Sequence, residues 1–175
     1  VFAGGGALNV KLNQKILQLP YVKELFVQPA ASDAGTAVGA ASYATWKRGI
    51  YPEKMEHVYL GPSYTTEECV AACESHEGNP VYEKVDDVSR KAAELLNDGN
   101  PVAWCQGRME FGPRALGGRS ILGNPGYKGI ADKINHQIKF RERWRPFCPS
   151  ILDTIASDMI DFIPKVQNDM SQKNV

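Results

Sequence analysis

The sequence has no excess charge, no cysteine pattern typical of metal or disulfide sites, and no apolar run long enough to span a membrane. Its 175 residues carry 20 Lys or Arg against 20 Asp or Glu, which argues against a general nucleic-acid binder. The small-residue run 30–44 is interrupted by Asp33 and is too short to cross a bilayer. Four cysteines without zinc or secretory spacing predict free, buried thiols in a reducing cytoplasm: Cys69, Cys73, Cys105 and Cys148.

The positive charge that is present is concentrated in one part of the chain. Six of the eight arginines lie between Arg108 and Arg145. The stretch 106–149 contains nine Lys or Arg against three Asp or Glu, so it carries six positive charges in excess. Because the whole chain is neutral, the remainder carries the opposite excess. This focused charge indicates a site for an anion rather than a generally basic surface.

The first basic element, which we call the arginine loop (106–122), follows a predicted buried strand at 102–105 and ends in a second one at 120–122. It holds Arg108, Arg114 and Arg119 among five residues that shape the backbone, Gly107, Gly112, Pro113, Gly117 and Gly118. Glycine allows close approach to a ligand, and proline forces Gly112 out of the helical region. Each guanidinium offers a planar fork that suits phosphate or carboxylate. The loop therefore predicts an anion site, with a solvated surface loop as the alternative.

The second basic element, which we call the basic segment (139–147), has the period of a strand. Alternation would place its cations, Lys139, Arg141, Arg143 and Arg145, on one face, and Phe140, Glu142 and Trp144 on the other. A nucleic-acid-binding module would use the same patch and stack bases on Phe111, Phe140 and Trp144. We expect these aromatic rings to face the core, which weighs against that function. A fragment that only binds or acts as a scaffold is the other alternative.

The first part of the chain follows an α/β pattern. A predicted strand at 1–3 runs into the glycine turn Gly4–Gly6, and a helix carrying Leu8, Leu12 and Ile16 follows. The N–H groups at such a helix start can face phosphate or ribose, although a tight turn needs glycines without any ligand. A second strand at 25–27 leads to Asp33, which we expect to cap a helix over 34–41 and to lie where α/β sheets place ligands.

The remaining predicted elements alternate between strands and helices. Strands are expected at 58–60 and 81–85, a capping box at Thr65 opens a helix, and Asp86 or Asp87 caps another that ends at Gly99. Isoleucines spaced four apart predict a further helix with one apolar face: Ile130, Ile134 and Ile138. The pattern is helical again after residue 152, and we expect 167–175 to fray.

Four segments together resemble a known family. These are GGGALNVKLN (4–13), FVQPAASDAGTAVGAA (26–41), GRMEFGPRALGGRSIL (107–122) and NHQIKFRERWRPFCPS (135–150). They are similar to the O-carbamoyltransferases of nodulation-factor and antibiotic biosynthesis, which place a carbamoyl group on a hydroxyl. The likeness extends over residues 1–152. Since the chain does not begin with Met, we expect it to be a fragment.

The resemblance implies an α/β fold in two parts. Residues 1–55 would form the C-terminal part of an actin-like ATPase fold, in which the acceptor binds. Residues 58–175 would form a YrdC-like carbamoyltransferase domain, expected to be incomplete. By this likeness, the second domain converts carbamoyl phosphate and ATP to a carbamoyl-adenylate, and the first passes the carbamoyl group to a hydroxyl of a small molecule or sugar.

The resemblance and the charge pattern together select the candidate site residues. Arg114 and Lys139 are the first choices to hold carbamoyl phosphate, because charge on phosphate oxygens needs preorganised cationic donors. The second choices for catalysis are Arg108, Arg119 and Arg145. The candidate ATP-binding residues are Gly4, Gly5, Gly6, Ser120 and Arg141.

The resemblance also implies a divalent metal, Fe or Mg, in the whole enzyme. There Asp33 would complete a site with two histidines from an earlier part of the chain. These histidines are not in this sequence, and His57, His76 and His136 lack the spacing to replace them. We therefore expect Asp33 to hold metal weakly or not at all. Neither a nucleic acid nor a membrane is an expected partner, a homo-oligomer is left open, and the sequence does not name the acceptor.

Overall fold

The computed structural model describes residues 1–160, and the expected fraying of 167–175 lies outside the described residues. The chain divides into two compact units. Among the described residues, the first unit comprises 1–60, the short segment 110–114, and 151–160. The second comprises 61–109 and 115–150. The centre of the arginine loop therefore belongs to the first unit, while its two flanks belong to the second.

The first unit opens with a glycine turn followed by a helix, in the predicted order. The expected strands at 1–3 and 25–27 are reduced to one parallel bridge between Phe2 and Val27, in which the Phe2 N–H donates to the Phe26 carbonyl at 2.9 Å. A 3-10 turn η1 (Gly5–Leu8) leads into α1 (Val10–Leu17). Asn9 caps α1, since its side chain accepts from the Leu12 N–H at 3.2 Å.

The second helix of this unit begins differently from the prediction. A 3-10 turn η2 (Asp33–Gly35) precedes α2 (Thr36–Lys47), and Ser32 stands at the cap position of that turn. The prediction that Asp33 caps the helix is wrong, because Asp33 is itself the first residue of the turn and its backbone carbonyl accepts from the Thr36 hydroxyl at 2.6 Å. Gly35 permits a close approach, since a Cβ there would collide with the Ala30 carbonyl oxygen.

The second unit contains two helices with the predicted caps. Thr65 opens α3 (Thr66–Ser75) with a complete capping box, in which its hydroxyl and the Glu68 carboxylate accept from each other's N–H at 3.2 and 2.7 Å. Asp87 caps α4 (Val88–Asn97) by accepting from the Arg90 N–H at 2.9 Å. Gly99 follows with a φ of 78°, as expected for a helix terminator.

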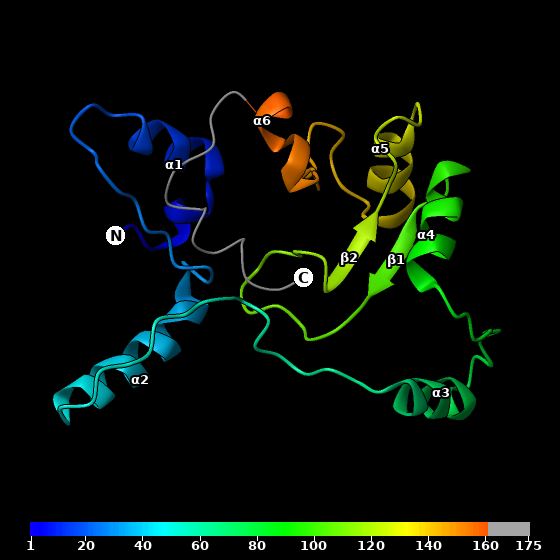
Figure 1. Cartoon of the computed structure of the whole chain (residues 1–175), viewed down its shortest axis with the longest axis horizontal. Coiled ribbons are helices and arrows are strands. Elements are labelled where there is room, and N and C mark those ends of the chain that lie inside the picture. Colours follow the sequence, from blue (N-terminus) through cyan, green and yellow to red (C-terminus); the bar gives the residue numbers. More distant parts are fainter. Residues whose placement is uncertain (161–175) are drawn as a thin grey trace. The chain divides into compact units, whose positions relative to one another are not determined.

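Two antiparallel strands form the only named sheet in the described residues. β1 (Val102–Cys105) pairs with β2 (Arg119–Leu122), as Figure 1 shows. In this register Val102 pairs with Leu122 and Cys105 with Arg119. Both strands occur where they were predicted, with β2 beginning one residue earlier, but neither is buried: β1 alternates between half-buried and exposed residues, and β2 is half-buried. α4 packs against β1. The strands expected at 58–60 and 81–85 are absent. The fold is thus mostly helical with a small sheet, a coarser result than the expected α/β architecture.

The isoleucine helix is confirmed but changes its winding. α5 (Ile130–Lys133) continues into η3 (Ile134–Ile138), a π-turn, and Ile130 and Ile134 are buried. In the first unit, a turn η4 (Asp153–Ile155) and α6 (Ala156–Met159) confirm the helical pattern after residue 152. The buried side chains among the described residues are small or isoleucine apart from one asparagine: Ala7, Ala30, Ala31, Ala92, Ile130, Ile134 and Asn135.

The cysteines are free, as predicted, but they are not buried. Cys69, Cys105 and Cys148 are exposed and Cys73 is half-buried. Cys105 is exposed because it ends β1, a strand with only one partner. Across residues 1–160 no helix is both long and apolar enough to cross a membrane.

Candidate anion-binding site

The backbone of the arginine loop takes conformations that only glycine adopts easily. Gly107, Gly112 and Gly117 have φ values of 60°, 107° and 100°. Gly112 precedes Pro113 and lies outside the helical region, as predicted. In addition, a Cβ on Gly112 would lie 2.8 Å from the Pro29 carbonyl oxygen, so this glycine also permits close packing within the first unit. The prediction that glycines give this loop an unusual backbone conformation is thus confirmed.

On the flanks of the loop, two arginines hold the main chain of the second unit. Arg119 donates through Nη1 to the carbonyls of Gln106, Gly107 and Gly118 at 3.3, 3.2 and 2.8 Å, and through Nη2 to Pro62 at 3.4 Å. Arg108 donates from Nε to the Gly61 carbonyl at 3.0 Å. The two side chains therefore meet the same short stretch, 61–62. These hydrogen bonds make Arg108 and Arg119 supports of the loop.

The central arginine of the loop reaches the glycine turn of the first unit. Arg114 donates from Nη2 to the Leu8 carbonyl at 2.8 Å, across more than 100 residues of sequence. Leu8 ends the turn that begins at Gly5, so Arg114 and the candidate nucleotide turn Gly4–Gly6 are parts of one local structure. On the flank, the Ser120 hydroxyl accepts from the Gly117 N–H at 3.0 Å and thereby helps to fix the loop.

The basic segment is not a strand, contrary to the prediction. It has no regular structure, and Phe140 takes a left-handed conformation with a φ of 47°, which ends any strand alternation. The aromatic rings do not face the core either. Phe140 is 83% exposed and Trp144 is 73% exposed. The prediction assumed the two-residue period of a strand. It failed because the π-turn at 134–138 and the left-handed Phe140 change the direction of the chain.

Two arginines of the basic segment are paired with carboxylates. Arg143 contacts Asp132 at 2.6 Å, and Arg145 contacts Glu142 at 3.1 Å while its guanidinium stacks 5.0 Å from the Trp144 ring centre. The pKa of Glu142 lies below its ordinary value because the carboxylate accepts from its own backbone N–H and from Arg145. These pairs are exposed, and each neutralises one positive charge of the segment.

Lys139 and Arg141 are held differently from these pairs. The Lys139 amine has no side-chain or carbonyl partner among the described residues, and only its backbone N–H is bonded, to the Ile134 carbonyl at 2.9 Å. Arg141 donates from Nε to the Asn135 side-chain oxygen at 2.7 Å and stacks 4.9 Å from the Phe147 ring centre. Neither cation is paired with a carboxylate in the described part of the chain.

The structure brings together some of the predicted site residues. Arg108 and Arg119 converge on one stretch, Arg114 joins the glycine turn, and Lys139, Arg141 and Arg145 lie in one segment. Arg114 and Lys139 belong to different units, so their joint action on one ligand stays a prediction. Sequence reasoning missed Asn135, a fully buried polar residue, because the period of the isoleucine helix gives it no special place.

The region around Asp33 offers few ligands for a cation. Asp33 is exposed, and no cluster of three or more His, Cys, Asp or Glu side chains occurs within residues 1–160. One carboxylate is a poor set for Fe or Mg, each of which takes several donors. The residues present here therefore do not by themselves fit the metal that the family likeness implies.

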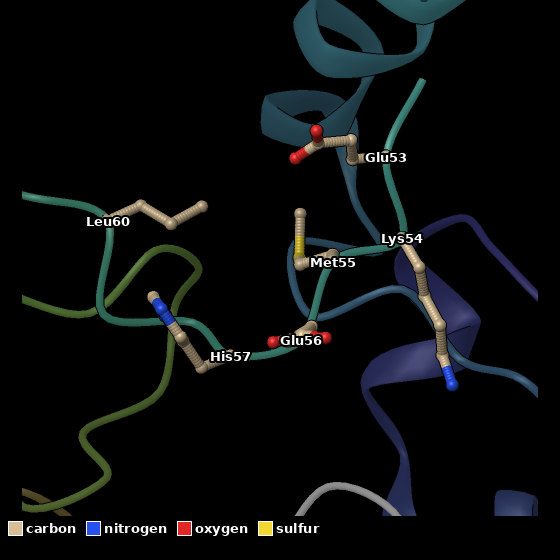
Figure 2. Close-up of a pocket in the computed structure, with 6 residues that line it drawn as sticks. All are labelled: Glu53, Lys54, Met55, Glu56, His57 and Leu60. Carbon is tan, nitrogen blue, oxygen red and sulfur yellow. The ribbon is translucent and has the colours of Figure 1, made fainter. Parts of the chain in front are cut away.

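The first unit also has a shallow hollow, which Figure 2 shows. Met55 and Leu60 point toward it, and its other lining residues come from the same continuous segment: Glu53, Lys54, Glu56 and His57. The lining includes two carboxylates, one lysine and one histidine, a mixture without the excess of positive charge that an anion site needs. None of the candidate site residues lines this hollow.

Comparison with known proteins agrees with this set of motifs. A family model described as "Carbamoyltransferase N-terminus" matches residues 1–42, and one described as "Carbamoyltransferase C-terminus" matches residues 93–173. The chain belongs to the carbamoyltransferase family. The second match includes the arginine loop and the basic segment, and the first includes the glycine turn.

The curated relatives of this carbamoyltransferase chain are longer proteins. It is 43% identical over 162 residues to nodulation protein NolNO of Sinorhizobium fredii, covering 91% of this chain and 24% of that protein. It is 41% identical to nodulation protein NolO of Bradyrhizobium diazoefficiens, with 91% and 30% covered, and 35% identical to nodulation protein U of Rhizobium tropici, with 90% and 26% covered. The chain thus spans about a quarter of the length of the relatives it matches.

Proposed function

We propose that this chain contributes to an ATP-dependent O-carbamoyltransferase. In this reaction carbamoyl phosphate, ATP and one water are converted to a carbamoyl-adenylate, with release of phosphate and pyrophosphate. The carbamoyl group then passes to a hydroxyl of a small-molecule or sugar acceptor, and AMP leaves. The observation that carries the proposal is the match to both the N-terminal and the C-terminal carbamoyltransferase models. The nodulation proteins among the relatives support a biosynthetic role.

The proposed fold assignment follows from the same family. Residues 1–55 would be the end of an actin-like ATPase fold that receives the acceptor, and 58–175 would be a YrdC-like domain that activates the carbamoyl group. The glycine turn would lie at the adenosine side of the nucleotide, because N–H groups at a turn before a helix can face phosphate or ribose. Asp33 would complete a metal site only with further ligands, since residues 1–160 contain no cluster of three or more His, Cys, Asp or Glu side chains.

In the proposed reaction the cations bind and orient the phosphate groups. Arg114 and Lys139 would hold carbamoyl phosphate: the Lys139 amine has no partner in the described residues, and Arg114 uses one donor on Leu8 and retains others. Arg141 and Ser120 would contact the nucleotide. Arg108 and Arg119 would support the loop through the carbonyls they already bind, and Arg145 would contribute less because Glu142 pairs with it.

One observation favours a second function, the binding of single-stranded nucleic acid. Phe140 and Trp144 are exposed, and Arg145 lies over the Trp144 ring, as in surfaces that stack unpaired bases. The expectation that these rings are buried no longer weighs against it. The zero net charge of the chain and its family membership still favour the carbamoyltransferase reaction.

Isothermal titration of the chain with three ligands separates these functions. We expect carbamoyl phosphate and ATP to bind and a single-stranded oligonucleotide of mixed sequence to bind weakly or not at all. Tight oligonucleotide binding without carbamoyl phosphate binding would replace the proposed function by the second one. We also expect the isolated chain to transfer no carbamoyl group, because it spans about a quarter of the length of its relatives. Turnover by purified chain, free of contaminating enzyme, would contradict this.

A further inference from the structure

We propose that Asn135 is a positioning residue, which holds the guanidinium of Arg141 in place for an anionic ligand. The inference rests on the proposed function, because it assigns Arg141 to a phosphate-bearing substrate. Asn135 is the largest fully buried side chain of the described residues, and it lies in the π-turn that follows α5. A buried amide is costly unless its polar atoms find partners, and here they do.

The partners of Asn135 all belong to the basic segment. Its side-chain oxygen accepts from Arg141 Nε at 2.7 Å, its side-chain nitrogen donates to the Arg143 carbonyl at 3.4 Å, and its backbone carbonyl accepts from the Arg141 N–H at 3.0 Å. One buried residue thus fixes both the main chain and a side chain of the segment. The reversal at Phe140 lies between these contacts.

Arg141 is constrained from two sides by this arrangement. Asn135 binds its Nε, and the Phe147 ring stacks against its planar group at 4.9 Å. The two terminal amino groups have no hydrogen-bond or ion-pair partner in residues 1–160. A guanidinium held at Nε and on one face keeps a donor pair available, and phosphate takes such a pair in a bidentate contact.

The choice of an amide at position 135 fits this role. An Asp at 135 would also accept from Arg141, but its negative charge would offset the charge that is to attract the anion, as Asp132 does for Arg143. A neutral acceptor orients the guanidinium and leaves its charge intact. Lys139 directly follows the same π-turn, and its backbone N–H donates to the Ile134 carbonyl at 2.9 Å, so the turn also fixes the start of the segment that carries Arg141.

A double-mutant cycle on the full chain tests the assignment, with carbamoyl phosphate as the titrated probe. Asn135→Leu removes the side-chain hydrogen bonds at similar volume, and Arg141→Lys removes the planar fork. Each substitution is expected to weaken binding roughly tenfold, and the double variant to be no weaker than either single one. Additive losses would overturn the inference, since they mean that Asn135 does not act through Arg141.

Two further variants and one ligand-free signal separate positioning from a loss of folding. Ile134→Val alters the same buried turn without touching Arg141 and should bind within twofold of the wild type. Asn135→Asp keeps the hydrogen-bond acceptor, so it should still hold Arg141 in place. Its added negative charge should nevertheless weaken the binding of carbamoyl phosphate. In NMR spectra the Arg141 Nε–H should exchange slowly with water in the wild type, Ile134→Val and Asn135→Asp, and rapidly in Asn135→Leu. Equal exchange in all four would overturn the inference.

If the wild type binds no carbamoyl phosphate, the proposed function fails, while the Nε–H signal still decides whether Asn135 holds Arg141.

Discussion

The arginine loop and the basic segment use the same residue type in two different ways. Arginines of the loop donate to main-chain carbonyls, as Arg114 does to Leu8 and Arg119 does to Gly118. Arginines of the basic segment contact side chains, as Arg143 does with Asp132 and Arg145 with Glu142. In the loop, arginine therefore builds the shape of the backbone. In the segment, carboxylates offset the charges of Arg143 and Arg145, whereas Lys139 and Arg141 have no carboxylate partner in the described residues.

The largest effect is expected where one arginine holds several carbonyls. Arg119→Met removes four hydrogen bonds to Gln106, Gly107, Gly118 and Pro62. Hydrogen bonds from a charged donor are stronger than neutral ones, and the bond to Gly118 is part-buried although the other three are exposed, so we expect the free energy of unfolding to fall by roughly 1–3 kcal/mol. Urea unfolding of the two proteins measures this difference. Arg90→Met is the control, because the Arg90 side chain makes an exposed ion pair with Glu94, and an equal loss in both would contradict the comparison.

The next effect concerns ligand affinity at the centre of the loop. Arg114→Lys keeps the charge but loses the planar fork, so carbamoyl phosphate should bind roughly tenfold more weakly, which corresponds to about 1.4 kcal/mol. Arg90→Lys, outside both basic elements, should leave the affinity unchanged. Titration at two salt concentrations also shows whether the charges are sheltered, since screening acts mainly on exposed ones. If the two variants behave alike, the arginine loop is only a solvated surface.

A smaller effect is expected when a neutralised cation of the basic segment is released. Asp132→Asn leaves Arg143 without its carboxylate partner, and this exposed pair contributes little to stability. The freed charge should raise the affinity for carbamoyl phosphate by no more than about threefold, with the gain lost at high salt. Glu94→Gln, which frees Arg90 far along the sequence, is the matched control. A weaker affinity in Asp132→Asn would mean that the pair orients Arg143 rather than neutralising it.

Local signals in the sequence predicted local structure well. Asp87 and the capping box at Thr65 act within one helical turn, and the strands predicted at 102–105 and 120–122 are short segments bounded by glycine, proline and asparagine residues. These features depend on neighbouring residues, so the sequence alone is sufficient to find them. The family motifs likewise lie in continuous stretches.

What could not be predicted depends on contacts between distant residues or on unusual backbone. The strand period at 139–145 was wrong, because the π-turn at 134–138 and the left-handed Phe140 change the direction of the chain. The contact of Arg114 with Leu8 joins residues more than 100 apart, and no periodicity indicates it. Asn135 escaped notice for the same reason, since its partners follow only after the reversal.

The smallest predicted effect tests whether Arg145 is charge-paired in solution. The pKa of Glu142 lies below its ordinary value because of its own backbone N–H and then Arg145. The stabilisation from a lowered carboxyl pKa is present above the unfolded value, about 4.3, and is lost as the pH falls through the folded value. We therefore expect the pKa of Glu142, followed by NMR titration of its carboxyl carbon, to be higher in Arg145→Gln than in the wild type. It should not reach the ordinary value, because the backbone hydrogen bond remains.

Arg143→Gln is the control for this titration, because Arg143 contacts Asp132 and contributes nothing to the Glu142 shift. The pKa of Glu142 should thus be higher in Arg145→Gln than in the wild type, and the same in Arg143→Gln as in the wild type. An unchanged midpoint in Arg145→Gln would mean that Glu142 does not neutralise Arg145. Arg145 would then join Lys139 and Arg141 as a cation available to a phosphate group, and the contrast between the loop and the basic segment would rest on Asp132 alone.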